Sequence, residues 1–264
     1  MVKVLVIGDS CVDEYIYCTA SRFCPDAPVP ILKPESYVCT EGMAGNVADN
    51  LRALGVEVDL ISNANQIKKT RYVDERTNHM FIRIDEGEDD IFPIAKKTLE
   101  NINWNQYDAI IISDYCKGFL TEDEISYISN QHINTFLDTK KSIGNWASNI
   151  NFIKINEVES DHNKTFLEDN YDMFKEKVIS TLGSKGARYK HYYFPVDKVD
   201  VRDTSGAGDT FMAGLVYAYI TRTHGFSMDK RIHKAIEFAN ECSTQIVQKK
   251  GTAKINLKEL NNEI

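Results

Sequence analysis

A glycine-rich turn that contains two aspartates is the strongest chemical feature of the sequence. It reads Asp203-Thr204-Ser205-Gly206-Ala207-Gly208-Asp209-Thr210-Phe211. Gly206 and Gly208 allow the backbone amides to face a ligand, and the small residues that follow favour a helix, whose N-terminus attracts anions. A carboxylate at position 209 would repel a bound phosphate, which is unexpected in a site that only binds. Its presence is explained if Asp209 takes the proton of a hydroxyl that attacks that phosphate. The turn therefore predicts phosphoryl transfer, and the alternative interpretation is a glycine turn with a capping aspartate.

Other common catalytic and metal-binding motifs do not occur. The sequence contains neither G-x-x-x-x-G-K-[ST] nor G-x-G-x-x-G, which disfavours P-loop kinases and standard dinucleotide enzymes. Six cysteines stand at irregular spacings without a C-x-x-C pair. A zinc site and a disulfide framework are therefore not expected. We expect free thiols in a reducing compartment, and hence a cytoplasmic protein.

The composition is that of a soluble globular protein. The chain has 264 residues, of which 42% are hydrophobic and 27% charged, and it is long enough for one large α/β domain with a substantial core. The net charge of −8 argues against bulk nucleic-acid binding, which needs a basic surface. Because no run of 18 apolar residues occurs, no membrane span is expected either.

Short apolar strands alternate with helices along most of the chain. The predicted strands cover residues 2–7, 56–62, 109–112, 136–137 and 152–155, with a hairpin at 187–194. The predicted helices cover residues 44–54, 121–130, 171–180, 211–221 and 232–247. This alternation predicts a mainly parallel sheet with crossover helices. Ligands bind beyond the carboxyl ends of such strands.

Residues 14–40 depart from this pattern because prolines interrupt their extended segments. Proline cannot donate to a sheet ladder, so these residues predict an edge or a small accessory sheet. Residues 70–84 predict one or two further strands. The acidic run from Glu86 to Asp90 predicts a solvated turn.

The 203–211 turn resembles the C-terminal signature of the ribokinase-like (PfkB) carbohydrate kinases. Further segments that resemble elements of this family follow one another in the family's order, namely Gly8-Asp9 with Asp13, Gly42 to Asn46, Asn156 to Glu159, and Gly183 to Gly186. The resemblance implies a ribokinase-like three-layer α/β fold, with a mainly parallel central sheet flanked by helices and a small β-sheet lid. Residues 1–264 would form a single kinase domain, with lid segments at about 14–40 and 72–85.

A narrower resemblance points to the heptose-7-phosphate kinase branch of that family. It is carried by five short stretches, at 21–30, 83–85, 113–118, 238–240 and 250–252. It implies transfer of the γ-phosphoryl group of ATP to O1 of D-glycero-D-manno-heptose 7-phosphate. The heptose branch often carries a nucleotidyltransferase domain after the kinase, and we expect none in this chain.

The resemblance also implies roles in phosphoryl transfer. Asp209 would be the base that activates the sugar's anomeric hydroxyl, and the amides of Gly206, Ala207 and Gly208 would neutralise charge on the transferred group. Mg²⁺ would bridge the ATP phosphates, with Asn156 and Glu159 orienting it through water. The residues implied on the nucleotide side are Asn156, Gly183, Gly186, Asn240 and Gly251.

On the acceptor side, Gly42 belongs to the implied sugar loop, and Asp13 and Asn46 would hydrogen-bond sugar hydroxyls. Lys117 is a candidate for the phosphate already on the substrate, and Arg76 is a second one. Local roles remain as alternatives, since Asp13 could cap a turn, Asn46 could be only a helix N-cap, and Lys117 could be a surface lysine. Glu159 could likewise be a solvated helix residue.

Two departures from the family leave other functions open. The sugar loop usually carries two adjacent glycines, and the second is Met43 here, which could narrow the backbone's approach to the sugar. The chain also runs almost directly from strand to strand between Gly55 and Lys68. The alternatives are a kinase for another sugar or a nucleoside, and an inactive protein that binds a sugar or a nucleotide. We further expect a homodimer that associates through the lid.

Overall fold

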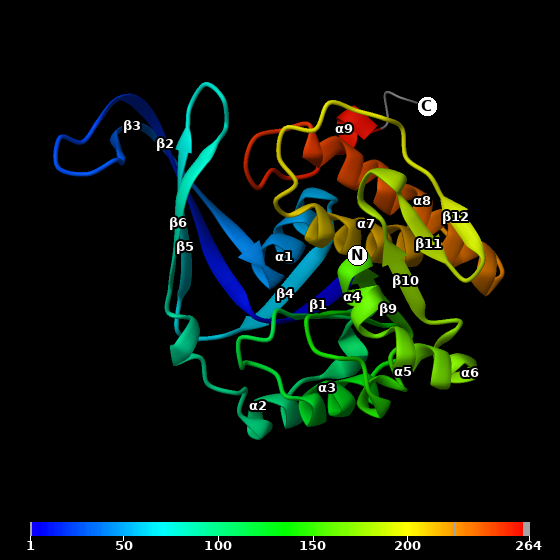
Figure 1. Ribbon diagram of the computed structural model, residues 1–264. Coiled ribbons are helices and arrows are strands. Elements are labelled where there is room, and N and C mark those ends of the chain that lie inside the picture. Colours follow the sequence, from blue (N-terminus) through cyan, green and yellow to red (C-terminus); the bar gives the residue numbers. More distant parts are fainter. Residues whose placement is uncertain (1, 224, 261–264) are drawn as a thin grey trace.

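The computed structural model describes residues 2–223 and 225–260 and contains two separate sheets (Figure 1). The large sheet has the strand order β12-β11-β10-β9-β8-β7-β1-β4 and is parallel from β4 to β10. Its strands are β1 Lys3–Gly8, β4 Glu57–Ser62, β7 Ala109–Asp114, β8 Thr135–Thr139, β9 Phe152–Asn156, β10 Val178–Thr181, β11 Ala187–Tyr189 and β12 Tyr192–Phe194. β11 and β12 form the predicted hairpin at one edge.

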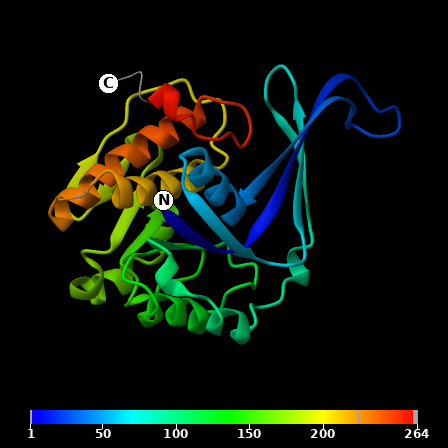
Figure 2. The same cartoon turned by 180° about the vertical axis from the view of Figure 1, so that it is seen from behind.

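Helices cover both faces of the large sheet (Figures 1 and 2). One face packs against α1 Ala44–Ala53, α7 Ala207–Thr221 and α8 Met228–Val247, and the other packs against helices that include α3 Glu122–Ser129. The remaining helices are α2 Lys96–Glu100, α4 Glu157–His162, α5 Lys164–Asp169, α6 Tyr171–Phe174 and α9 Leu257–Leu260. Strand residues alternate between the two cores, so that Val4 and Val6 face one and Leu5 and Ile7 the other. These three layers confirm the predicted fold class.

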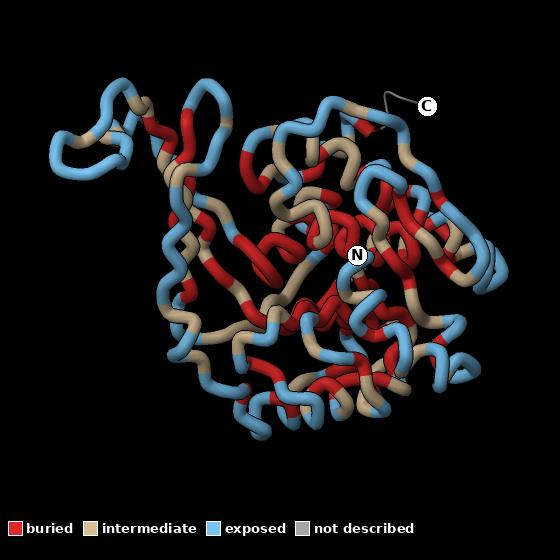
Figure 3. Tube along the Cα trace, in the orientation of Figure 1, coloured by how far each residue is buried: buried red, intermediate tan, exposed pale blue. Residues whose placement is uncertain are grey.

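The small sheet stands to one side of the main body (Figures 1 and 2). Its order is β3-β2-β5-β6, with β2 Ser10–Phe23, β3 Pro30–Met43, β5 Ile67–Asp74 and β6 Met80–Glu86. The predicted segments 14–40 and 72–85 lie within these strands and their turns. The chain leaves the large sheet at Gly8 and returns to the main body at Met43, the last residue before α1. Much of β3 and β6 is exposed (Figure 3).

The carboxyl ends of the parallel strands meet at one edge of the large sheet. The register pairs Gly8 with Ser113, Ser113 with Asp138 and Asp138 with Lys154. The loops that follow these strands therefore bring their polar residues together. The first turn of α7 reaches the same edge, because a β-carbon on Gly208 would lie 3.2 Å from Nζ of Lys154.

One predicted helix is wrong. Residues 171–180 form a single helical turn, α6, followed by strand β10, because Lys175 to Lys177 end the turn and Ile179 is buried in the sheet. Two predicted helices begin four residues earlier than expected, α7 at Ala207 and α8 at Met228. The direct passage from β4 to β5 is confirmed.

All cysteines of the chain lie within the described residues, and each is a free thiol. Over residues 2–223 and 225–260, helices that combine the length and the apolar character needed to cross a membrane are absent.

Candidate active site

The glycine-rich turn forms the N-terminus of α7. Gly206 caps the helix with a φ of 77°, a left-handed conformation that glycine adopts without strain. Ser205 donates its backbone N–H to Asp203, which fixes the preceding turn. The amides in the first turn of a helix have no partner within it. Ala207 donates its N–H to the carbonyl of Thr204 at 3.2 Å, so the amides of Gly208 and Asp209 form the anion-attracting group at the start of the helix.

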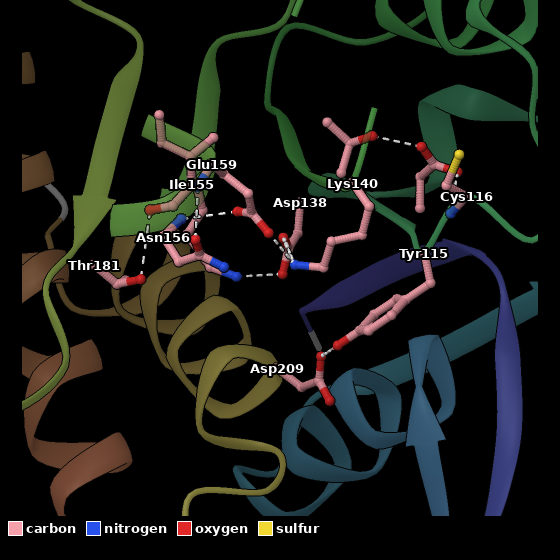
Figure 4. Close-up of polar contacts among 12 residues, drawn as sticks. Tyr115, Cys116, Asp138, Lys140, Ile155, Asn156, Glu159, Thr181 and Asp209 are labelled. Carbon is pink, nitrogen blue, oxygen red and sulfur yellow. Dashed lines mark hydrogen bonds and ion pairs between the residues drawn. The ribbon is translucent and has the colours of Figure 1, made fainter. Parts of the chain in front are cut away.

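Asp209 is buried and receives one hydrogen bond on each carboxylate oxygen, of which Figure 4 shows the one from Tyr115. Nδ2 of Asn46 donates to Oδ2 at 3.0 Å, and the hydroxyl of Tyr115 donates to Oδ1 at 2.6 Å. Burial raises the pKa of Asp209 to about 6, against the effect of these two hydrogen bonds, and the negative charge of Asp138 adds to the rise. The carboxylate is thus mainly ionised at neutral pH but close to its titration range, as a general base requires.

A charged cluster lies beside this carboxylate, at the ends of β8 and β9. Lys154 and Asp138 form a buried ion pair. Lys140 pairs with Glu159 and lies 3.8 Å from Oδ1 of Asp138. Burial opposes the positive charge of Lys140, but the neighbouring carboxylates outweigh it and raise its pKa. The cluster places the ammonium groups of Lys140 and Lys154 near the first turn of α7.

Asn156 and Glu159 hold each other at the start of α4. The side chain of Asn156 accepts the backbone N–H of Glu159, and Glu159 accepts the backbone N–H of Asn156, both at 2.8 Å. This capping box is a structural role in its own right. Among the described residues, no group of three or more His, Cys, Asp or Glu side chains could hold a metal ion directly. Asn156 and Glu159 carry amide and carboxylate oxygens, which are ligands that Mg²⁺ accepts, so this pair fits contact with a hydrated ion.

A cavity of about 480 Å³ opens beside the 203–211 turn and is lined by three of the five residues predicted on the nucleotide side. Its lining includes Gly183, Gly186 and Asn240 together with Ala207 and Gly208. Apolar side chains such as Val196, Val201, Phe211 and Val247 complete it. A flat apolar group with an attached phosphate could therefore lie in the cavity with its phosphate at the amides of α7.

Gly251 lies outside the described lining of that cavity. Its backbone N–H donates to Asp203 at 3.1 Å, and a β-carbon there would lie 3.5 Å from the hydroxyl of Tyr17. The next residue, Thr252, shares a hydrogen bond of 3.2 Å with the hydroxyl of Tyr15. Gly251 thus connects the 203–211 turn to the small sheet.

The residues predicted on the acceptor side lie where the small sheet joins the main body. Asp13 forms an ion pair with Arg71, whose guanidinium lies 5.1 Å from the centre of the Tyr15 ring. A β-carbon on Gly42 would collide with Asp13 and Cys11. Asn46 is the third residue of α1 and not its N-cap, which is Met43.

Lys117 is paired and not free. Its ammonium contacts Glu88, whose other oxygen lies 3.4 Å from Nζ of Lys69. The acidic run was predicted to be a solvated turn, but Glu88 is half-buried between these two lysines. Arg76 lies away from them, in the turn that Asp74 caps by accepting the backbone N–H groups of Arg76 and Thr77.

Sequence reasoning assigned no role to Tyr115, Arg71 or Lys154. The motif at 113–118 included Tyr115, but only the folded chain brings its hydroxyl to Asp209. Arg71 reaches Asp13 because β2 and β5 are parallel neighbours that pair Tyr15 with Arg71. A lysine within an apolar strand such as 152–155 is a signal that could have identified Lys154, since a buried lysine requires a partner.

Comparisons with known proteins agree with this architecture. The profile of the family described as "pfkB family carbohydrate kinase" matches residues 46–259. Proteins named "Bifunctional protein HldE" are 28% identical in Nitratiruptor sp. and 29% identical in Helicobacter acinonychis, each over 98% of this chain and over 64% and 66% of the relative. The chain thus spans just under two thirds of the length of these curated relatives.

Solved structures share the fold at low identity. Ribokinase from Thermotoga maritima superposes with a TM-score of 0.68 at 16% identity and covers all of both chains. A nucleoside kinase of the ribokinase family from Methanocaldococcus jannaschii has a TM-score of 0.67 at 17% identity, covering 99% of this chain and 97% of that one. Ribokinase from Arabidopsis thaliana, solved with ribose and ATP, has a TM-score of 0.67 at 16% identity and covers 99% and 98%.

Proposed function

Because the chain belongs to the pfkB family of carbohydrate kinases, we propose that it transfers the γ-phosphoryl group of ATP to a hydroxyl of a sugar phosphate. The acceptor we propose is O1 of D-glycero-D-manno-heptose 7-phosphate. The observation that carries the proposal is the buried Asp209 carboxylate in the first turn of α7, next to the cavity that fits a nucleotide. The stretches at 21–30 and 113–118, which resemble the heptose-7-phosphate kinase branch, support the acceptor.

In the proposed reaction, Asp209 takes the proton of the acceptor hydroxyl while that oxygen forms a bond to the γ-phosphorus. The bond between this phosphorus and the bridging oxygen of ATP breaks, and ADP leaves with the electron pair. The amides of Gly206, Ala207 and Gly208 would stabilise the charge on the transferred group, for which the amide of Ala207 would exchange its bond to Thr204 for one to a phosphoryl oxygen. A pKa of about 6 leaves Asp209 ionised at neutral pH, which is the state that can accept a proton.

ATP would bind as its Mg²⁺ complex in the cavity beside α7. Gly183, Gly186 and Asn240 would line the part of the cavity that holds the nucleoside. Gly251 would support the 203–211 turn through its hydrogen bond to Asp203. Asn156 and Glu159 would orient the hydrated ion through water. When bound, Mg²⁺ would neutralise charge on the phosphates.

The acceptor would lie between the small sheet and the main body. Asp13, Gly42 and Asn46 would contact its hydroxyls, and Asn46 would also hold Asp209 as it does here. Lys117 together with Lys69 would bind the phosphate already on the sugar. In the structure a carboxylate, Glu88, bridges these two ammonium groups, so an anionic group of the substrate could take its place.

The small sheet would act as a lid that excludes water, and its outer face would pair with a second copy of the chain. The strand register places Tyr37, Tyr72 and Ile82 in one row with Ile16 on that face. Tyr37 and Ile82 are more than half exposed, at 57% and 52%, and single chains seldom leave such a row uncovered. Ile82→Glu should therefore shift the sedimentation coefficient from dimer to monomer, and a parent that already sediments as a monomer contradicts the dimer.

The proposal is tested by ADP release with Mg-ATP and a panel of acceptors that includes heptose 7-phosphate, the free heptose, other sugar phosphates and nucleosides. We expect turnover with heptose 7-phosphate and little with the free heptose. Asp209→Asn should lower kcat by about 10²-fold or more, as expected for loss of a general base, without abolishing binding of Mg-ATP.

The other outcomes separate the alternatives. Turnover with another sugar or a nucleoside would retain the kinase and reject the heptose assignment, and Met43 is the residue that would favour this result. Thermal stabilisation by a sugar or by Mg-ATP, without turnover on any acceptor, would indicate a binding protein instead. Turnover that is indifferent to Asp209→Asn would reject the proposed base.

A further inference from the structure

Tyr115 contacts the same carboxylate that we propose as the base (Figure 4). Its hydroxyl donates to Oδ1 of Asp209, while Asn46 donates to Oδ2, so each oxygen has a donor of its own. Two donors on different oxygens fix the plane of a carboxylate, which a single donor leaves free to rotate. We propose that Tyr115 is a positioning residue, whose phenol holds the Asp209 carboxylate in the orientation that accepts the proton of the acceptor hydroxyl. This inference rests on the role proposed for Asp209.

The backbone of Tyr115 is fixed independently of Asp209. Asp9, a fully buried residue at the end of β1, accepts the backbone N–H groups of Tyr115 at 2.8 Å, Lys117 at 3.2 Å and Phe119 at 3.3 Å. One carboxylate therefore anchors the loop after β7 at three points. A positioning residue needs an anchor of this kind, because a phenol on a mobile loop could not fix the group it touches.

The ring of Tyr115 is also held from the side of the charged cluster. Nζ of Lys140 lies 5.4 Å from the ring centre, and the same ammonium pairs with Glu159 and Asp138. The attraction between a cation and an aromatic ring favours this placement. Tyr115 thus connects the predicted base to the residues expected near the nucleotide phosphates, and its side chain is held at the ring and at the hydroxyl.

The ionisation states suit this role. Burial and the negative charge of Asp209 raise the pKa of Tyr115 well above its usual range, so the phenol keeps its proton and remains a donor. Burial and the charge of Asp138 raise the pKa of Asp209, whereas the hydrogen bonds from Tyr115 and Asn46 and the charge of Lys154 lower it. Lys140 and Cys11 also interact electrostatically with Asp209. Removing the phenol hydroxyl should therefore raise the pKa of the base further.

A purely structural role for Tyr115 makes different predictions, and Tyr115→Phe separates the two because it keeps the ring. Tyr107→Phe is a matched control, since the Tyr107 hydroxyl also donates to a carboxylate, that of Asp59, at 2.8 Å, outside the site. The profile of kcat/KM against pH is measured between about pH 5 and 9, with Mg-ATP and the acceptor that the parent uses. For Tyr115→Phe we expect kcat to fall about tenfold or more and the acid limb to move up by about one pH unit. The Kd of Mg-ATP should stay within about twofold, as for loss of a contact outside the nucleotide cavity. Tyr107→Phe should change neither kcat nor the position of the acid limb.

A second measurement needs no acceptor. The urea midpoints of the parent, Tyr115→Phe, Asp209→Asn and the double variant form a cycle. If the hydroxyl acts on Asp209, Tyr115→Phe lowers the midpoint less in the Asp209→Asn background than in the parent.

An unmoved acid limb, an equal shift in Tyr107→Phe, or equal midpoint losses in both backgrounds would overturn the positioning role. A parent that turns over no acceptor would instead overturn the proposed function, and the positioning role of Tyr115 in catalysis with it. The two failures are therefore distinguishable.

Discussion

Asn46 and Asp209 are 163 residues apart in the sequence, yet the amide of Asn46 donates to the Asp209 carboxylate at 3.0 Å in the buried junction of α1 and α7. Asn50, one turn later in α1, donates to the side-chain oxygen of Asn46 at 2.9 Å and thereby sets the orientation of its amide. Helix α1, which follows β3 of the small sheet, is thus joined by hydrogen bonds to α7, the helix that begins with the glycine turn. Asn46, which was predicted on the acceptor side, and the predicted base consequently belong to one hydrogen-bonded unit.

Gly206 should be essential to this unit. It has a φ of 77°, and a β-carbon there would lie 2.6 Å from Nδ2 of Asn46. Gly206→Ala should therefore displace Asn46 from Asp209 and lower kcat by about 10-fold or more, as for loss of a hydrogen bond to a charged group. Gly55→Ala is the control, because Gly55 has a φ of 84° with open space around it. Both variants should lose stability in urea, but only Gly206→Ala should lose activity. Equal activities would contradict the argument.

The activity should have an acid limb set by Asp209. Burial raises the pKa of this group to about 6, and only the ionised form can take a proton. Below that pH, kcat/KM should fall about tenfold for each pH unit. The folded state holds this proton more tightly than the unfolded chain, so the contribution of Asp209 to stability falls as pH rises from about 4 to 6. In urea titrations, the unfolding free energy of Asp209→Asn should therefore rise relative to that of the parent as the pH increases from about 4 to 7. A difference between the two free energies that does not change with pH would contradict the raised pKa.

Much of the fold was accessible from sequence because its strands are short runs of buried β-branched residues between polar ends. The helix predicted at 171–180 failed for a physical reason. Val178 to Ser180 is too short for its periodicity to separate a strand from a helix, and its neighbours in the sheet, β9 and β11, decide the outcome.

The candidate site was accessible only in part. The glycine turn and Asp209 lie within one nonapeptide, so local chemistry pointed to them, and their catalytic role stays a prediction. Tyr115 reaches Asp209 only through the packing of the loop after β7 against α7. Lys117 was considered as a free cation, but the fold supplies Glu88 as its partner. Contacts of this kind depend on strand order, which no single segment specifies.

Lys154 should contribute to both stability and activity, and the two can be separated. Its ammonium pairs with Asp138 in a buried position next to Gly208. Lys154→Met leaves the Asp138 charge with only the more distant ammonium of Lys140, at 3.8 Å, and should cost about 3 kcal/mol of unfolding free energy. Adding Asp138→Asn removes that charge and should recover most of the loss in urea titrations. If Lys154 also assists the transferred group, the double variant stays impaired in kcat. A double variant that recovers stability and full activity would restrict Lys154 to a structural role.

At position 43, the glycine variant should be more stable than the alanine variant, which is the reverse of the order inside a helix. It caps α1 with φ 56° and ψ −131°, a conformation that strains any residue except glycine. Its side chain is 3% exposed and packs with Cys11 and Ile67, so that apolar burial offsets the strain. Met43→Ala and Met43→Gly both lose that burial, but only alanine retains the strain. We therefore expect Met43→Gly to be the more stable of the two by about 1 kcal/mol.

Urea titration of two pairs of variants measures this reversal. Val47→Ala and Val47→Gly provide the control, because Val47 lies in the body of α1, where glycine should be less stable than alanine by about 0.5–1 kcal/mol. The same order in both pairs would mean that the strained cap does not exist in solution. Met43→Gly also restores the second glycine of the sugar loop. If Met43 narrows the approach to the acceptor, the KM for the acceptor should change in this variant while the KM for Mg-ATP does not, because Met43 does not line the cavity proposed for the nucleotide.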